Sequence, residues 1–136
     1  MPHFQCTHCK RTITPLLAEV PLPPPVPPRP DESSGNRIRS PRMPPGTYAR
    51  NRHPDEWVPE PTGFVLHPDD ILGVEPHPDV SRLYGCCGLA GTDGRLNLVC
   101  AGCGNELATL QADCYTQNQV TLDFVRTIRS YCREPD

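Results

Sequence analysis

Two Cys-x-x-Cys elbows, far apart in a chain of 136 residues, are the residues best suited to chemistry. The first elbow spans Cys6–Cys9 and the second spans Cys100–Cys103. Each elbow holds two thiolates on one tight turn, and two elbows together make the tetrahedral four-sulfur set that zinc prefers. We therefore predict a Zn²⁺ site with the ligands Cys6, Cys9, Cys100 and Cys103.

Three further cysteines offer alternative ligands: Cys86, Cys87 and Cys114. One member of the adjacent pair lies a zinc-ribbon distance before the second elbow, and Cys114 follows that elbow closely. A rival site would therefore combine these cysteines with the second elbow and leave the first elbow to a histidine or a second metal. The two-elbow set is preferred, because the two thiolates of each elbow have the spacing that tetrahedral coordination of one ion requires. Cys132 is expected to be a buried thiol.

Catalytic use of the thiols is the competing interpretation. In thioredoxin-like enzymes a Cys-x-x-Cys motif opens a helix of a βαβ unit, and neither elbow here has a helical pattern behind it. The glycine-rich segment 85–94 contains the Cys86–Cys87 pair but lacks the lysine and the glycine spacing of a phosphate-binding loop. A thiol-dependent or metal-dependent enzyme that uses this pair remains the alternative to a non-enzymatic protein.

Composition predicts a single small domain over residues 1–136 that needs a cross-link to be stable. Hydrophobic residues make up 36% of the chain and aromatic residues 6%, while prolines number 19. Such a chain has a small core for its length, so metal ions or disulfides are expected to stabilise it. Residues 1–5 have no signal-peptide character, and no apolar run is long enough to span a membrane. We expect a cytoplasmic protein whose eight cysteines are reduced and available to metal.

Residues 21–56 form a proline-rich and arginine-rich excursion. Its first part, residues 21–30, is expected to be an extended polyproline II segment, and the remainder a loop or partly disordered. Residues 24–29 match the Pro-x-x-Pro-x-Arg pattern of SH3 ligands, although a stiff strap along the domain surface is the simpler interpretation. Arginine is strongly preferred over lysine here, which is typical of a GC-rich bacterial genome.

The remaining pattern predicts mostly strands. We expect a hairpin of residues 4–6 and 11–14 around the first elbow, strands at 63–66 and 96–99, and a hairpin of residues 106–112 and 119–122. A single helical turn is expected at 67–73. Apolar residues at helical spacing over 123–132, with Asp123 as N-cap, predict a C-terminal helix. The predicted fold class is a small β-rich (α+β) zinc-stabilised domain.

His-Pro-Asp occurs three times, at 53–55, 67–69 and 77–79. Proline fixes φ and the neighbouring polar side chains cap turns, so a structural role is preferred. A second metal or acid/base site made of His67, Asp69, Asp70 and His77 is the alternative.

The elbows and the segment Phe64–Cys114 resemble zinc-knuckle and zinc-ribbon proteins and uncharacterised bacterial cysteine-rich proteins. The spacing of the elbows, once the excursion is removed, is similar to that of methionine sulfoxide reductase B, Yippee and cereblon-like domains. These resemblances imply a β-sheet domain that is stabilised by zinc, and they imply no particular activity.

The functional prediction is a non-enzymatic zinc-binding protein of the bacterial cytosol that acts as a protein-interaction module. The alternative is a nucleic-acid-binding zinc-ribbon protein. It would use six arginines between Arg29 and Arg52, where two acidic residues leave a local charge of +4 in a chain of net charge −3. Tyr48 is the single aromatic residue among these arginines, which is too few for the interleaved aromatic pattern of single-stranded nucleic-acid binding, so a protein partner is preferred.

Overall fold

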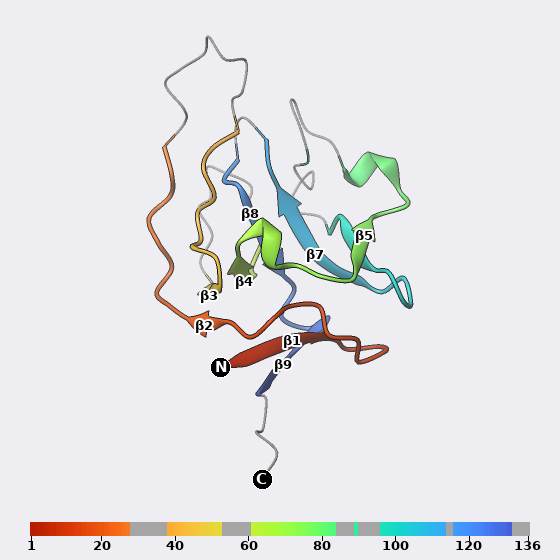
Figure 1. The fold of residues 1–136 in the computed structure, drawn as a ribbon. Coiled ribbons are helices and arrows are strands. Elements are labelled where there is room, and N and C mark those ends of the chain that lie inside the picture. The colour runs from red at the N-terminus through yellow and green to blue at the C-terminus, as the bar shows by residue number, and fades with distance from the viewer. Residues whose placement is uncertain (28–37, 53–60, 84–88, 90–95, 114–115, 132–136) are drawn as a thin grey trace.

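The computed structural model of the protein describes residues 1–27, 38–52, 61–83, 89, 96–113 and 116–131. Strands dominate these residues, with two single-turn 3-10 helices, η1 (Pro68–Asp70) and η2 (Val80–Arg82) (Figure 1). The strands are β1 (Pro2–Cys6), β2 (Ala18–Glu19), β3 (Thr47–Asn51), β4 (Gly63–Leu66), β5 (Val74–Pro76), β6 (Leu98–Cys100), β7 (Glu106–Gln111), β8 (Gln119–Leu122) and β9 (Thr127–Tyr131).

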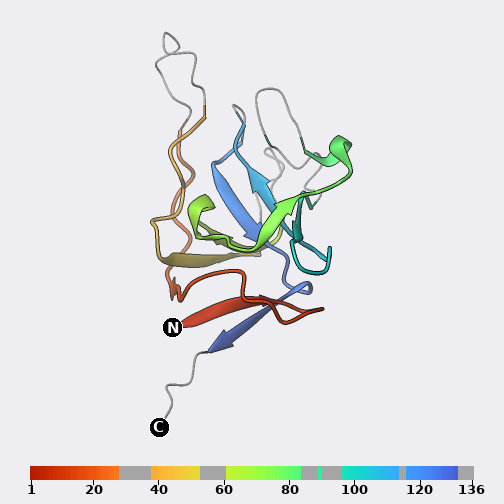
Figure 2. The same ribbon diagram turned by 45° about the vertical axis from the view of Figure 1, so that its right-hand side comes forward.

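Seven strands form one sheet in the order β2-β3-β4-β8-β7-β6-β5, and β1 pairs with β9 in a separate two-stranded ribbon (Figures 1 and 2). Every pairing is antiparallel except the short β2–β3 pair. The predicted strand at 63–66 is confirmed as β4, and the predicted hairpin of 106–112 and 119–122 is confirmed as β7 and β8. The single turn within 67–73 is confirmed as η1.

The predicted C-terminal helix is wrong. Thr127–Tyr131 form β9, which lies antiparallel to β1 from Pro2↔Tyr131 to Cys6↔Thr127. Asp123 does cap the backbone, since its Oδ1 accepts hydrogen bonds from the N–H groups of Val125 and Arg126, but the chain makes only a turn there. The apolar spacing over 123–132 misled the prediction, because Val125 is exposed and the free edge of β1 offers backbone partners to the segment.

The predicted α+β class is wrong for the same reason, because no helix of seven or more residues occurs in the described ranges. The hairpin predicted for residues 4–6 and 11–14 is confirmed in short form. The N–H of Cys6 donates to the carbonyl of Arg11 and the N–H of Ile13 donates to that of Phe4, with one antiparallel bridge, Gln5↔Thr12. The other edge of β1 pairs with β9 along five residues, a partner that the sequence analysis did not predict.

Four aromatic rings join the β1–β9 ribbon to the large sheet. Phe4 of β1 meets the ring of Tyr48 at 5.1 Å and that of Phe64 at 4.9 Å between centroids. Phe124, just before β9, meets Phe64 edge-on at 4.7 Å. Alternation along β4 and β8 turns Phe64, Leu66, Val120 and Leu122 to the same face, where they form the main core. The core thus lies between ribbon and sheet and holds the end of β1 in place.

The excursion predicted over 21–56 contains a strand. Tyr48 and Ala49 of β3 are fully buried, so the expectation of a loop throughout 31–56 is wrong. Residues 21–27 lie along the large sheet as an extended strap (Figure 1). Gln117 anchors the strap by accepting from the N–H of Val26 at 2.8 Å and donating to its carbonyl at 3.1 Å. Residues 28–37 and 53–56 of the excursion lie outside the described residues.

Candidate metal centre

The four cysteines of the two elbows meet at one point. All four Sγ atoms lie within 4.8 Å of one another. The shortest contacts cross from one elbow to the other, with 3.6 Å between the sulfurs of Cys6 and Cys103 and 3.5 Å between those of Cys9 and Cys100. Sulfurs at this separation can surround one ion at the metal–sulfur distance of zinc, about 2.3 Å. All four are free thiols in the structure.

The first elbow follows β1 directly. The N–H of Lys10 donates to the carbonyl of Cys6 at 3.0 Å, and the N–H of Cys6 donates to the carbonyl of Arg11 at 2.9 Å. Lys10 adopts a φ of 65°, and it is the one non-glycine residue with positive φ among those described. The turn needs this left-handed residue to reverse the chain beneath the sulfurs.

The second elbow is the turn between β6 and β7, and it repeats the same hydrogen bonds. The N–H of Gly104 donates to the carbonyl of Cys100 at 2.8 Å, and the N–H of Cys100 donates to the carbonyl of Asn105 at 2.8 Å. Gly104 has a φ of 78°, at the position that Lys10 holds in the first elbow. Glycine adopts this left-handed conformation without steric strain. Two matching knuckles therefore face each other, one from the ribbon and one from the sheet.

Hydrogen-bond donors surround the sulfurs. Burial raises the pKa of Cys6, but the N–H groups of Cys9 and His8 and the side-chain amide of Asn105 overcome it and lower that pKa to about 6. The Asn105 Nδ2 lies 3.5 Å from the Cys6 sulfur. The N–H of Asn105 favours the thiolate of Cys103, yet burial and the three neighbouring sulfurs raise its pKa to about 12. The cluster thus resists carrying four negative charges, and a cation at its centre would relieve that repulsion.

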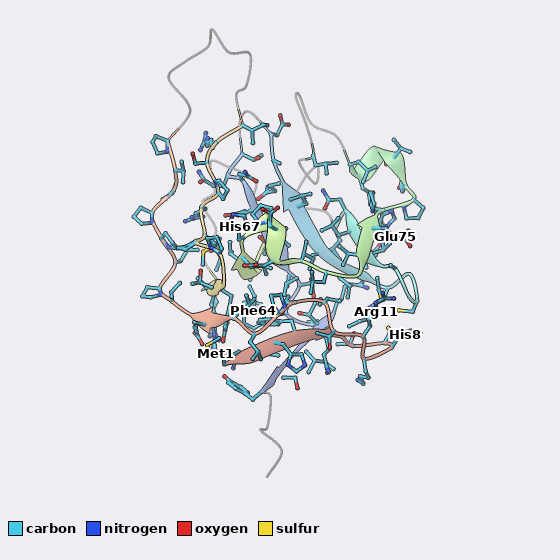
Figure 3. The ribbon with its side chains drawn as sticks, in the orientation of Figure 1. Met1, His8, Arg11, Phe64, His67 and Glu75 are labelled. Carbon is cyan, nitrogen blue, oxygen red and sulfur yellow. The ribbon has the colours of Figure 1, made fainter. Side chains whose placement is uncertain are left out.

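Arg11 lies beside the second elbow. The Arg11 side chain packs closely on two glycines. A Cβ atom built on Gly73 would lie 2.8 Å from the Nε of Arg11. A Cβ atom built on Gly102 would lie 3.3 Å from the Arg11 guanidinium and 3.7 Å from the Cys100 sulfur. Figure 3 shows Arg11 and His8 at this end of the molecule, near the sulfur atoms. The guanidinium therefore places positive charge close to the cysteine sulfurs. The Lys10 ammonium instead donates to the carbonyl of Thr7 at 2.9 Å.

Burial differs across the cluster. Cys6 and Cys100 are fully buried and belong to the main core, whereas Cys103 is half-buried and Cys9 is exposed. One side of the site is therefore continuous with the hydrophobic core, and the other side reaches the surface. A structural metal fits this position, because the ion would continue the core at the point where apolar side chains end.

The other sequence candidates do not join this cluster in the described part of the chain. Cys86, Cys87, Cys114 and Cys132 lie outside the described residues, so the rival ligand set stays a hypothesis. His67, Asp69, Asp70 and His77 do not gather at one point, since the elbows alone form a ligand group among the described residues. Both histidines serve turns instead: the Nδ1 of His67 accepts from the N–H of Asp69, and that of His77 from the N–H of Asp79.

An ionic cluster around Glu106 was missed by the sequence analysis. The carboxylate of Glu106 accepts from His77 at 2.8 Å, contacts the guanidinium of Arg82 and lies 3.9 Å from that of Arg126. The hydrogen bond from His77, together with the two arginines, lowers the pKa of Glu106 against the opposing effect of burial. The partners come from the residue after β5, from η2 and from the turn before β9, so no local sequence pattern signals the cluster.

Comparisons with protein-family models, with curated proteins and with solved structures find no match to this chain. The resemblance to zinc-knuckle and zinc-ribbon proteins therefore stays a prediction. Among the described residues, no helix has the length and apolar character needed to cross a membrane. The chemistry of the site has to be argued from the geometry of the four thiols themselves.

Proposed function

We propose that the protein is a structural zinc protein in which one Zn²⁺ joins the β1–β9 ribbon to the large sheet. The convergence of four thiols on two matching knuckles supports this most directly. Four sulfur donors in tetrahedral reach favour zinc over the oxygen-seeking ions, and a closed four-ligand set leaves no position for substrate. Free thiols of this kind persist in a reducing compartment such as the bacterial cytosol.

Metal analysis of the purified protein tests this role. We expect about one zinc per chain in the wild type, and loss of zinc with unfolding in Cys9→Ser and Cys103→Ser, because structural zinc contributes on the order of 10 kcal/mol to small domains. Cys114→Ser makes the same change of side chain at a cysteine outside the proposed ligand set, and it serves as the comparison variant. A wild-type protein that contains no metal and stays folded in chelator would contradict the proposal. If the wild type binds two ions and Cys114→Ser binds only one, a second metal site that includes Cys114 would be supported.

We further propose that the domain acts without catalysis, as a protein-interaction module that presents its strap. The strap is held firmly, because Arg42 donates to the carbonyl of Pro23 at 3.0 Å in addition to the clamp of Gln117 on Val26. Leu22 and Val26 are half-buried, while Pro21, Pro24 and Pro27 are exposed. Exposed prolines three apart form one ridge of a polyproline II helix, the feature that aromatic-lined grooves bind.

A comparison of captured partners tests the strap. We expect the wild-type chain to retain a reproducible protein partner from lysate, and the double variant Pro24→Ser with Pro27→Ser to lose it. Val80→Ser changes a residue that is also exposed but lies on η2, so it serves as the control. Absence of any reproducible partner, or equal retention by the double variant, would count against the strap as the binding element.

The charges of the excursion weigh against the nucleic-acid alternative. Arg39 donates to the carbonyl of Val26 at 3.0 Å, Arg42 to that of Pro23, and Arg50 pairs with Glu19 at 3.4 Å. These arginines are used within the chain, which leaves less free positive charge for phosphates. We expect no salt-dependent binding to DNA or RNA. The enzyme alternative based on Cys86–Cys87 predicts a fast-alkylating thiolate, and uniformly slow alkylation of the native protein would remove it.

A further inference from the structure

The four sulfurs of the metal centre include two close pairs, and each pair joins one elbow to the other. The sulfur of Cys9 lies 3.5 Å from that of Cys100, and the sulfur of Cys6 lies 3.6 Å from that of Cys103. A disulfide bond is about 2 Å long, so each pair has to close by about 1.5 Å to form one. The two pairs use every sulfur once, so both bonds can form in the same molecule.

Access from solvent differs within each pair. Cys9 is exposed, as is His8 beside it, and Figure 3 shows His8 at the edge of the molecule. Cys100, the close neighbour of Cys9, is fully buried. In the second pair Cys103 is half-buried and Cys6 is fully buried. A small oxidant in solution therefore reaches Cys9 first, and each accessible cysteine has a buried cysteine of the other elbow next to its sulfur.

We propose that Cys9 is a site of oxidation by hydrogen peroxide, and that the reaction ends in two disulfides between the elbows, Cys9–Cys100 and Cys6–Cys103. The inference rests on the proposed function for its metal, because a cysteine that coordinates zinc is held as the thiolate, the form that peroxide oxidises. The pairing itself rests only on the positions of the four sulfurs.

The first disulfide forms in two steps. The thiolate of Cys9 attacks one oxygen of the peroxide, so that an S–O bond forms, the O–O bond breaks, and the departing hydroxide takes up a proton to become water. The thiolate of Cys100 then attacks the sulfur of the resulting sulfenic acid, so that an S–S bond forms, the S–O bond breaks, and a second hydroxide leaves as water. The two sulfurs together lose two electrons, which reduce one peroxide to two molecules of water. A second peroxide oxidises Cys103 and Cys6 in the same way.

Oxidation exchanges one cross-link for another at the same place. A disulfide sulfur is no longer a thiolate, so zinc loses its ligands and leaves. The ribbon stays joined to the sheet, because the new bonds connect the two elbows across sequence separations of 91 and 97 residues. Bonds that close such long loops constrain the unfolded chain strongly. Disulfides within the elbows, Cys6–Cys9 and Cys100–Cys103, have the opposite effect, since they leave the elbows without a cross-link to each other.

Disulfide mapping of the peroxide-treated wild-type protein tests the pairing. Trypsin cuts after Lys10 and so delivers the two elbows in different peptides. We expect these peptides to be joined, and fragmentation of the joined product to place the bonds at Cys9–Cys100 and Cys6–Cys103. Any other product overturns the proposal, whether it is two separate elbow peptides, each two hydrogens lighter, or bonds to the four remaining cysteines. Cys114→Ser is the control, and it should give the same joined peptides.

A reagent that traps sulfenic acids, such as dimedone, identifies the sulfur that is attacked first. With less peroxide than protein, we expect the label within the elbows on Cys9, because it is the exposed member of the set. Label that collects first on Cys6 or Cys100 would overturn the assignment of Cys9. This reading uses the wild-type chain and does not depend on the folding of any variant.

Zinc content and circular dichroism separate this inference from the proposed function. Zinc measured before oxidation tests the metal site alone, and a protein without zinc contradicts the proposed function while its thiol pairing can still be mapped. On oxidation we expect about one zinc per chain to be released and the β-sheet signal to remain in chelator, until reduction of the disulfides abolishes it. Loss of the sheet on oxidation alone would overturn the proposal and leave the zinc site standing.

Discussion

At the scale of single residues, the two knuckles form the same turn with different residues at the left-handed position, Lys10 in one and Gly104 in the other. Gly104 takes its left-handed conformation without strain, whereas Lys10 takes the same conformation at a cost of about 1 kcal/mol. No atom lies within 4 Å of a Cβ built at Gly104, so the only obstacle to a side chain there is the backbone angle. The lysine recovers part of its strain through the hydrogen bond to Thr7.

This difference predicts opposite effects of two exchanges at equivalent positions. Lys10→Gly should raise the free energy of unfolding by up to about 1 kcal/mol, since it removes the strain, and Gly104→Ala should lower it by about 1 kcal/mol. Urea unfolding of the zinc-loaded proteins measures both. Lys10→Ala is the control, since it keeps the strained angle and loses the bond to Thr7, and it should not be stabilised. Stabilisation by Gly104→Ala would show that the left-handed turn is not required.

At the scale of elements, Glu106 connects β7 to parts of the chain that the metal does not reach. Its contacts with His77 and Arg82 fix β5 and η2, and its contact with Arg126 fixes the turn before β9. Because the side chain of Glu106 is only 26% exposed, these interactions are partly shielded from solvent. They are expected to stabilise the β5–η2 side of the sheet by about 1 kcal/mol.

The lowered pKa of Glu106 gives this contribution a pH dependence. A carboxyl group whose pKa is lowered by folding stabilises the protein above its unfolded pKa, here the ordinary value of 4.5, and the stabilisation is lost as the pH falls through the folded value. The difference in unfolding free energy between wild type and Glu106→Gln should therefore be about 1 kcal/mol at pH 7 and shrink below pH 4.5.

Unfolding of both proteins across this pH range, with the metal held saturating, measures the difference directly. Glu75→Gln is the matched control, because Glu75 lies on β5, two strands away from Glu106 in the same sheet, and is exposed. A difference that stays constant down to acid pH would show that the charge of Glu106 does not stabilise the fold.

At the scale of the whole molecule, the four-cysteine cluster and the aromatic core are two of the connections between ribbon and sheet. Cys6 ends β1, while Cys100 ends β6 and Cys103 precedes β7, so an ion among them closes a loop of most of the chain. A cross-link of this kind constrains the unfolded chain strongly, because the joined residues are remote in sequence. Because the composition predicts a small core, we expect the remaining structure to depend on this cross-link.

Removal of the metal should therefore unfold the chain cooperatively. Addition of a strong chelator is expected to abolish the β-sheet circular dichroism at 25 °C, and addition of zinc should restore it, because metal binding and folding share the same free energy. Hydrogen exchange at substoichiometric chelator would show the order in which the strands lose their protection. We expect the amides of β1 and β9 to lose protection no later than those of β7 and β8. A metal-free protein that keeps the whole sheet would contradict this dependence.

The local features were determined by the sequence. The spacing within each Cys-x-x-Cys elbow fixes the bite of two sulfurs, and the alternating pattern of β7 and β8 fixes a hairpin between neighbours in the chain. The left-handed Gly104 and the capping Asp123 also follow from properties of one or two residues. These predictions succeed because the energies that decide them act over a few residues.

Tertiary structure alone decided which remote segments pair. Thr127–Tyr131 became a strand and not a helix because the edge of β1 supplied hydrogen bonds and Phe124 packed on Phe64. The convergence of the elbows, the cluster around Glu106 and the burial of β3 likewise depend on contacts between distant parts of the chain. A short apolar segment satisfies either periodicity, so its conformation is settled by whichever partner can pair its backbone and bury its side chains.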